Sequence, residues 1–122
     1  VNGLTYRNED GTPASNPDYP YIADLDEIPF AAPFIKRHLN HRDYFFAASA
    51  YPEIQIFTGR GCPARCAFCV YPQTMHGHRY RVRSVENVIA EIEYIRDNFP
   101  DVKEIVIEDD TFTINKKRTM AF

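Results

Sequence analysis

The sequence predicts an α/β fold, namely the N-terminal part of a partial β/α barrel preceded by an irregular linker. Two apolar segments typical of strands, 54–58 and 104–108, flank a segment with helical periodicity at 85–95. A strand, a helix and a strand in this order predict a βαβ unit with parallel strands and a right-handed crossover. Residues suited to chemistry follow both strands directly. We therefore expect a site at the carboxyl ends of the strands.

Composition limits the possible classes of protein. The 122 residues are 44% hydrophobic and 25% charged, which is ordinary for a globular domain. A net charge of −3 gives no reason to expect binding to the phosphates of a nucleic acid. No apolar run is long enough for a membrane span, and the first residues show no signal-peptide pattern. We therefore expect a cytoplasmic protein without a transmembrane segment.

Residues 1–52 are predicted to form a linker or connector. Six of the nine prolines lie there, together with turn signals such as Asp10-Gly11. We expect a small hairpin around residues 4–11, then an extended crossing at 24–29 and a short helix at 34–39.

Residues 53–122 are predicted to contain the βαβ unit. The first strand, Ile54 to Thr58, alternates in polarity and is rich in β-branched residues. The helix follows Ser84, a residue suited to the N-cap, and places its apolar residues on one face. Residues 104–108 form an apolar run flanked by charges, which predicts a second, buried strand. Asn115 is placed to cap a further helix.

Cys62, Cys66 and Cys69 are the only cysteines, and they follow the first predicted strand with the spacing C-x-x-x-C-x-x-C. Three thiolates are too few to close a four-ligand metal site. A [4Fe–4S] cluster held by three cysteines keeps one iron open, and that iron can bind a small molecule. Gly59 and Gly61 give the backbone freedom to wrap around so compact a group. We therefore predict a [4Fe–4S] cluster at this loop.

A structural zinc site is the alternative reading of the same cysteines. His76 and His78 follow Cys69 within ten residues, and three cysteines with one histidine are a common zinc ligand set. Zinc sites usually pair two C-x-x-C knuckles, however, which three cysteines within eight residues do not supply. A disulfide framework fits worse, because an odd number of cysteines leaves one sulfur unpaired. A small zinc-binding interaction module therefore stays open as the non-enzymatic alternative.

The cysteine motif, with the aromatic Phe68 before its third cysteine, resembles the signature of the radical S-adenosylmethionine (SAM) superfamily. The chain is also similar to the cobalamin-binding branch of that superfamily over four segments, which are 3–7, 22–30, 81–84 and 108–113. Within this branch it resembles the hopanoid-biosynthesis-associated radical SAM proteins at residues 58–66 and 71–74.

The resemblance implies a set of cofactors and a reaction class. The open iron of the cluster would bind SAM, and an electron donor would reduce the cluster to cleave SAM into a 5′-deoxyadenosyl radical, which takes hydrogen from an unactivated carbon. A cobalamin-binding domain would precede the linker. The intact enzyme would then methylate or rearrange a small molecule or a lipid, such as a hopanoid. A radical SAM enzyme that does not use cobalamin is the second enzymatic hypothesis.

Three residues besides the cysteines are candidate cofactor contacts. Many radical SAM proteins receive the SAM ammonium group at a Gly-Gly-Glu stretch after the second strand, where this chain has Glu108, Asp109 and Asp110. A carboxylate can accept charge-assisted hydrogen bonds from an ammonium group. Only one of Asp109 and Asp110 can do so if the strand continues through them, and Asp109 is preferred. The alternative is that the pair caps the following turn. Phe68 is expected to pack on the cluster or the adenine.

Two further expectations concern the basic segment 76–83 and the extent of the chain. His76, His78, Arg79, Arg81 and Arg83 either contact an anionic ligand or form a solvated lead into the helix, and no role is assigned to them. The chain starts without a methionine and stops as a helix begins. We therefore expect a fragment that is inactive alone.

Overall fold

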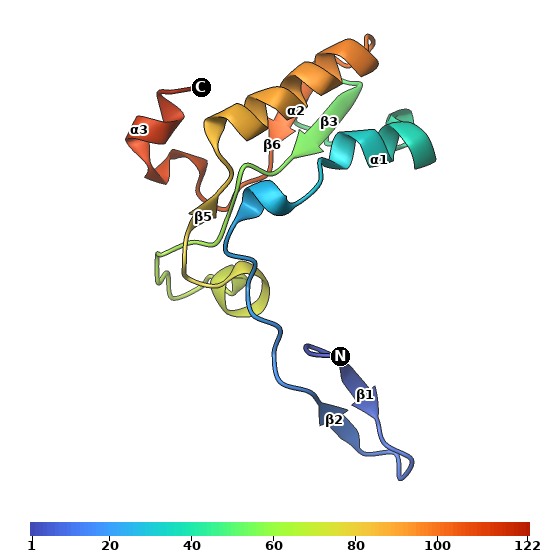
Figure 1. The fold of residues 1–122 in the computed structure, drawn as a ribbon, viewed down its shortest axis with the longest axis vertical. Coiled ribbons are helices and arrows are strands. Elements are labelled where there is room, and N and C mark those ends of the chain that lie inside the picture. The colour runs from blue at the N-terminus through green and yellow to red at the C-terminus, as the bar shows by residue number, and fades with distance from the viewer.

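The computed structural model describes every residue from Val1 to Phe122. An N-terminal hairpin lies apart from the body of the molecule and is joined to it by an extended segment (Figure 1). The hairpin consists of β1 (Thr5–Arg7) and β2 (Pro13–Ser15), which pair in antiparallel fashion. The predicted hairpin is therefore confirmed.

The connector is more helical than predicted. A 3-10 turn, η1 (Leu25–Glu27), replaces the expected extended crossing, because the Asp24 side chain accepts a hydrogen bond from the Asp26 backbone N–H and closes the turn. The expected short helix is confirmed as α1 (Ala31–His38), and a second 3-10 turn, η2 (His41–Asp43), follows it.

The body is built on the predicted βαβ unit. Strands β3 (Glu53–Ile56) and β6 (Glu104–Ile107) are parallel, with Ile54 opposite Ile105. Helix α2 (Val85–Asn98) connects them in sequence and lies beside both strands (Figure 1). The two strands form the whole of this sheet, so the structure contains a single βαβ unit.

Polar caps define the ends of the helices. The Ser84 hydroxyl accepts a hydrogen bond of 3.1 Å from the Asn87 backbone N–H, which confirms Ser84 as the N-cap of α2. The Asn115 side chain likewise accepts a bond from the Arg118 backbone N–H and begins α3 (Lys116–Thr119), directly after the 3-10 turn η4 (Phe112–Ile114). The predicted cap of the last helix is therefore confirmed.

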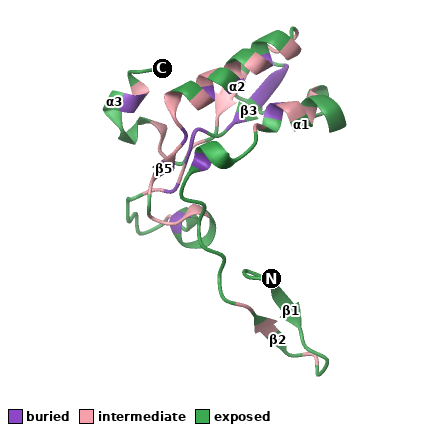
Figure 2. Ribbon diagram, viewed as in Figure 1, coloured by how far each residue is buried: buried purple, intermediate pink, exposed green.

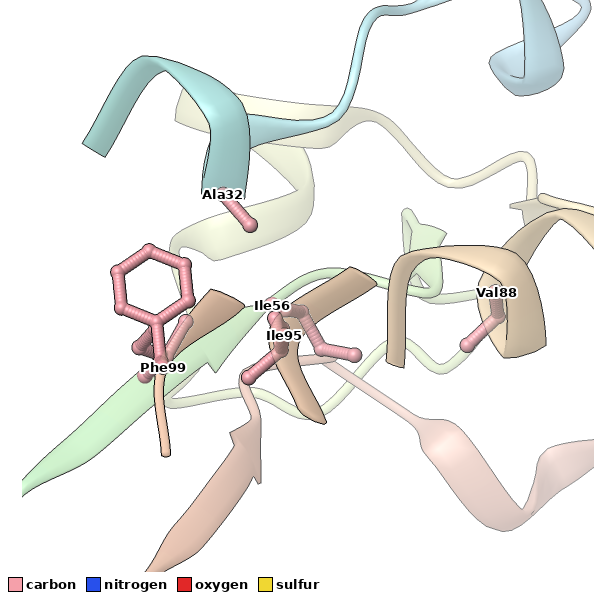
Figure 3. Close-up of a cluster of buried hydrophobic side chains, with 6 residues drawn as sticks. Ala32, Ile56, Val88, Ile95 and Phe99 are labelled. Carbon is pink, nitrogen blue, oxygen red and sulfur yellow. The ribbon is translucent and has the colours of Figure 1, made fainter. Parts of the chain in front are cut away.

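The hydrophobic core lies between α2, β3 and α1. Its buried side chains come from these three elements and from the residue that follows α2. They are Ala32, Ile54, Ile56, Val88, Ile95 and Phe99 (Figure 3). Burial colours show the same pattern, with β3 buried and β6 only partly so (Figure 2). The second strand was predicted to be buried; its presence is confirmed, but Glu104 is exposed and Ile105 to Ile107 are only half-buried.

A long excursion of the chain separates β3 from α2. Two short strands, β4 (Gly59–Arg60) and β5 (Arg81–Val82), pair in antiparallel fashion at its base. We call residues 61–80 between them the cysteine excursion. It contains one π-helical turn, η3 (Pro72–His76). None of the helices combines the length and the apolar character that crossing a membrane requires.

Candidate functional site

All three cysteines lie in the cysteine excursion, which leaves the body at the carboxyl end of β3. Gly61 begins it with φ +89°, and a Cβ on this residue would lie 2.3 Å from the backbone oxygen of Arg79. Only glycine tolerates both the conformation and the close approach. The next residue, Cys62, donates its backbone N–H to the carbonyl of Gly77 at 3.2 Å. The first cysteine is therefore held against the returning limb of the excursion.

The donor set at this loop fits an iron–sulfur cluster. All three thiols are free, with Cys62 and Cys69 half-buried and Cys66 exposed. Thiolates are the protein ligands of such clusters. No three side chains among the histidines, cysteines, aspartates and glutamates gather closely enough to hold a single metal ion. His78 directs Nδ1 to the carbonyl oxygen of Cys62, at 3.2 Å, and not to a thiol.

The Asp109 carboxylate binds the start of the excursion. Its Oδ1 accepts hydrogen bonds from the backbone N–H groups of Thr58, at 2.7 Å, and Gly59, at 2.9 Å. Its Oδ2 accepts a bond of 2.5 Å from the Thr58 hydroxyl. Both oxygens are therefore engaged in fixing the backbone that follows β3.

The Asp110 carboxylate contacts the cysteine excursion at two points. Its Oδ2 accepts a hydrogen bond of 3.1 Å from the Gly61 backbone N–H and lies 3.0 Å from Nδ1 of His76. Because β6 ends at Ile107, strand alternation no longer separates Asp109 from Asp110: Asp109 binds the residues that lead into the excursion, and Asp110 binds the excursion itself. Oδ1 of Asp110 makes no hydrogen bond within the chain, so this carboxylate retains acceptor capacity.

The aromatic side chains near the last cysteine face solvent. Phe68 is 89% exposed and Tyr71 is 60% exposed. Neither is used by the core, so both are accessible to a bound molecule.

Two arginines of the basic segment are structural. Arg83 is buried and pairs with the buried carboxylate of Glu91, with 2.5 Å between Nη1 and Oε2. Arg81 is also buried and donates hydrogen bonds to the carbonyl oxygens of Ile22, at 2.7 Å, and His76, at 2.9 Å. The interpretation of the segment as a solvated lead into the helix is therefore wrong for these two residues. Arg79 is exposed and has no such bonds.

Burial shifts the proton affinities of two groups beside the first strand end. The Arg60 guanidinium stacks on the Phe57 ring, with its carbon 3.5 Å from the ring centroid. Burial lowers the pKa of Arg60, while the negative charges of Asp109 and Asp110 oppose that shift. Burial also raises the pKa of the Tyr80 phenol, since desolvation disfavours its anion.

Sequence reasoning missed two residues at this site, Thr58 and Arg118. Thr58 has no exposed surface, and Nη2 of Arg118 donates to its carbonyl oxygen at 3.0 Å. Thr58 was included only as the last residue of the predicted strand. Arg118 carries no local signal, because it follows two lysines in a short basic run that reads as exposed.

The comparison with protein families decides the class of the protein. The family model described as the radical SAM superfamily matches residues 56–122, which include β6, α2 and the whole cysteine excursion. The chain belongs to the radical SAM superfamily. Members of this superfamily are enzymes that use a [4Fe–4S] cluster and SAM, so the match favours the cluster over the zinc module.

Two curated relatives are named as methyltransferases. An uncharacterized methyltransferase of Pyrococcus horikoshii is 37% identical over 122 residues, covering 97% of this chain and 24% of the relative. The cytidylyl-2-hydroxyethylphosphonate methyltransferase of Streptomyces wedmorensis is 32% identical over 143 residues, covering 93% of this chain and 25% of the relative. The chain thus spans about a quarter of the length of these relatives. No solved structure matches the chain.

Proposed function

We propose that the chain is the cluster-binding part of a radical SAM methyltransferase, with Cys62, Cys66 and Cys69 as the ligands of a [4Fe–4S] cluster. The observation that carries the proposal is the set of three free thiols in one excursion, at the carboxyl end of β3 and within the family match. When bound, the cluster supplies the electron that cleaves SAM reductively.

The side chains around the excursion have distinct parts in this proposal. The exposed Cys66 is accessible to an incoming cluster, while the half-buried Cys62 is fixed through its backbone by Gly77. Asp110 keeps one carboxylate oxygen free and can accept a hydrogen bond from the SAM ammonium group. The sequence favoured Asp109 for that contact, but both of its oxygens already accept bonds from residues 58 and 59. The exposed Phe68 offers an apolar face to the adenine.

Methyl transfer is the reaction that the relatives support. Both relatives are named methyltransferases, although neither name states a cofactor. We propose cobalamin as the methyl carrier because residues 3–7 and 22–30 of the linker, 81–84 at the entry to α2 and 108–113 after β6 resemble the cobalamin-binding branch. A radical SAM methyltransferase without cobalamin is the alternative. Loading the intact protein, which includes the cobalamin-binding domain proposed to precede the linker, with cobalamin and measuring its absorbance separates the two, since only the first binds the corrin.

The proposed substrate is a small molecule or a lipid. A hopanoid lipid follows from the resemblance at residues 58–66 and 71–74. The relative from Streptomyces wedmorensis is named for a cytidylyl phosphonate, which makes an anionic nucleotide-linked molecule a second candidate.

The proposed domain organisation divides the chain at residue 52. Residues 1–52 are a connector that follows a cobalamin-binding domain, and residues 53–122 are the first βαβ portion of a barrel. The relatives are about four times as long as the matched region, which leaves room for both the domain and the remaining strands.

Spectroscopy of the reconstituted protein tests the proposal. The protein is incubated with iron and sulfide without oxygen, reduced, and studied by electron paramagnetic resonance with and without SAM. We expect a reduced four-iron signal that shifts when SAM is added, and we expect Cys62→Ala to abolish it. A matched control is Ser15→Ala, an exposed residue of the hairpin that lies outside the excursion. A protein that forms no cluster and holds one tightly bound zinc instead would contradict the proposal.

A further inference from the structure

We propose that Arg118 and Asp109 are positioning residues, which hold the cysteine excursion at a fixed place relative to the sheet. This inference rests on the proposed function, because the excursion matters only if it holds the cluster. It gives α3 a part in the site, although α3 contains no residue predicted to bind a cofactor.

The place where the excursion leaves and rejoins the body is its neck, which we define as residues 57–59 and Arg83. The two limbs meet there through one backbone hydrogen bond of 2.9 Å, from the N–H of Arg83 to the carbonyl of Thr58. Gly59 also begins β4, which pairs with β5, but β3 has ended before the neck, and side chains bind the N–H groups of Thr58 and Gly59 and the carbonyls of Thr58 and Arg83.

Asp109 satisfies the donors on one side of the neck. Its carboxylate accepts the N–H groups of Thr58 and Gly59 and the hydroxyl of Thr58. Bonds from backbone N–H groups to an ionised carboxylate are stronger than those between neutral groups. The carboxyl end of β6 is thereby fastened to the carboxyl end of β3, directly before the first cysteine.

Arg118 satisfies the acceptors on the other side of the neck. Its Nη2 donates to the carbonyl oxygens of Thr58, at 3.0 Å, and Arg83, at 3.2 Å, and its Nε donates to Arg83 at 3.3 Å. A single planar guanidinium therefore bridges the outgoing and the returning limb, which a lysine ammonium cannot do with the same geometry. Arg118 is only 8% exposed, so its charge has given up most of its contact with water for these bonds.

Asp109 and Arg118 together bind the N–H, the hydroxyl and the carbonyl group of Thr58. Its N–H and hydroxyl are held by Asp109, and its carbonyl is held by Arg83 and Arg118. Thr58 lies four residues before Cys62, so a displaced neck displaces the first thiol. Groups that hydrogen-bond directly to metal ligands change metal affinity by about 10- to 100-fold when they are removed, and we expect the lower end of that range for contacts that act through the backbone.

Substitution of Arg118 tests the inference in the purified, anaerobically reconstituted protein. We compare Arg118→Gln, which loses the bridge, with Arg118→Lys, which keeps the charge, and with Lys117→Ala, an exposed control on the same helix. Three quantities are measured: the folded state of the protein without iron by circular dichroism, the rate of iron loss to a chelator, and the electron paramagnetic resonance spectrum.

We expect Arg118→Gln to fold and to lose iron about tenfold faster or more. The cluster that it retains should give a broadened spectrum, because the thiols are no longer held in one arrangement. Arg118→Lys should lie between the wild type and Arg118→Gln, and Lys117→Ala should match the wild type. The spectrum is the readout that a purely structural contribution to stability would leave unchanged.

The possible outcomes separate this inference from the proposed function. If the wild type forms no cluster, the proposed function fails and this inference fails with it. If the wild type forms one, and both Arg118 variants lose iron at its rate with its spectrum, only the inference is overturned. If Arg118→Gln is unfolded, Arg118→Lys is compared with the wild type instead. An unchanged rate of iron loss and an unchanged electron paramagnetic resonance spectrum would then overturn the inference.

Discussion

Thr58 is the residue around which the site is organised. It is fully buried, and its backbone and hydroxyl groups are bound by Asp109, which follows β6, by Arg118 of α3, and by Arg83, which precedes α2. A buried polar group that lost such a partner would carry a desolvation cost of about 1–3 kcal/mol. The conformation of the neck is therefore specified by polar contacts, whereas the core is formed by apolar ones.

Gly61 gives a prediction at the scale of one residue. We expect Gly61→Ala to lower the free energy of unfolding by more than the roughly 1–3 kcal/mol of an unfavourable φ angle, because the new methyl group would also collide with the backbone of Arg79. The measurement is denaturant unfolding, together with iron content after reconstitution.

Gly11→Ala is the matched control, because Gly11 also has a positive φ but has nothing within 4 Å of the added carbon. Because Gly11 lies in the separate hairpin between β1 and β2, its substitution should cost stability only within the hairpin and leave the unfolding of the body and the iron content unchanged. Equal effects of the two substitutions on stability and on iron would show that the close approach at Gly61 is not significant.

At the scale of secondary-structure elements, Glu91 connects α2 to α1 and to the neck of the excursion. This residue of α2 is 2% exposed, and its Oε1 accepts the backbone N–H of Ala31 at 3.0 Å and that of Ala32 at 3.4 Å. Its Oε2 pairs with Arg83, which in turn donates to the carbonyl of Phe57 at 2.8 Å. A carboxylate on one helix thus caps another helix and supports the neck of the excursion.

We therefore expect Glu91→Ala to destabilise the protein by about 3–5 kcal/mol, because it leaves the Arg83 guanidinium buried and unpaired and uncaps α1. Chemical denaturation followed by circular dichroism measures the change. The control is Glu93→Ala on the same helix, whose side chain is 56% exposed and which should change stability by less than about 0.5 kcal/mol. Similar values for the two variants would rule out the buried pair as a major contribution.

The shape of the whole molecule departs from that of a compact domain. Its accessible surface is 8835 Å² for a mass of 14.2 kDa, whereas a compact monomer of this mass would expose about 6,800 Å². The separate hairpin accounts for part of the excess, and the hydrogen bonds of residues 1–16 stay within residues 1–17 (Figure 1).

Removal of residues 1–17 should accordingly leave the body unchanged. We expect a shift of the melting temperature of less than about 3 °C, since no hydrogen bond to the body is lost. Differential scanning calorimetry of the shortened and the full chain makes the comparison. A fall larger than about 5 °C would mean that the hairpin stabilises the body after all.

The local pattern of the sequence determined the main elements. Apolar periodicity predicted β3, α2 and β6, and the caps Ser84 and Asn115 were recognised from their residue type and position. The local pattern also predicted the class of the protein. The cysteine spacing and Phe68, which indicate that class, all lie within eight consecutive residues. Signals of this kind are contained in short segments, so no knowledge of the fold is needed to find them.

The tertiary structure alone decided which polar residues serve the excursion. Asp109 reaches Thr58 across 51 residues, and Arg118 reaches it across 60. Arg81 and Arg83 belong to a basic segment that reads as solvated, yet both are buried and donate to the carbonyl oxygens of Ile22, 59 residues from Arg81, and of Phe57, 26 residues from Arg83. Side-chain contacts over such separations depend on how the elements pack, and neither periodicity nor residue type reports that packing.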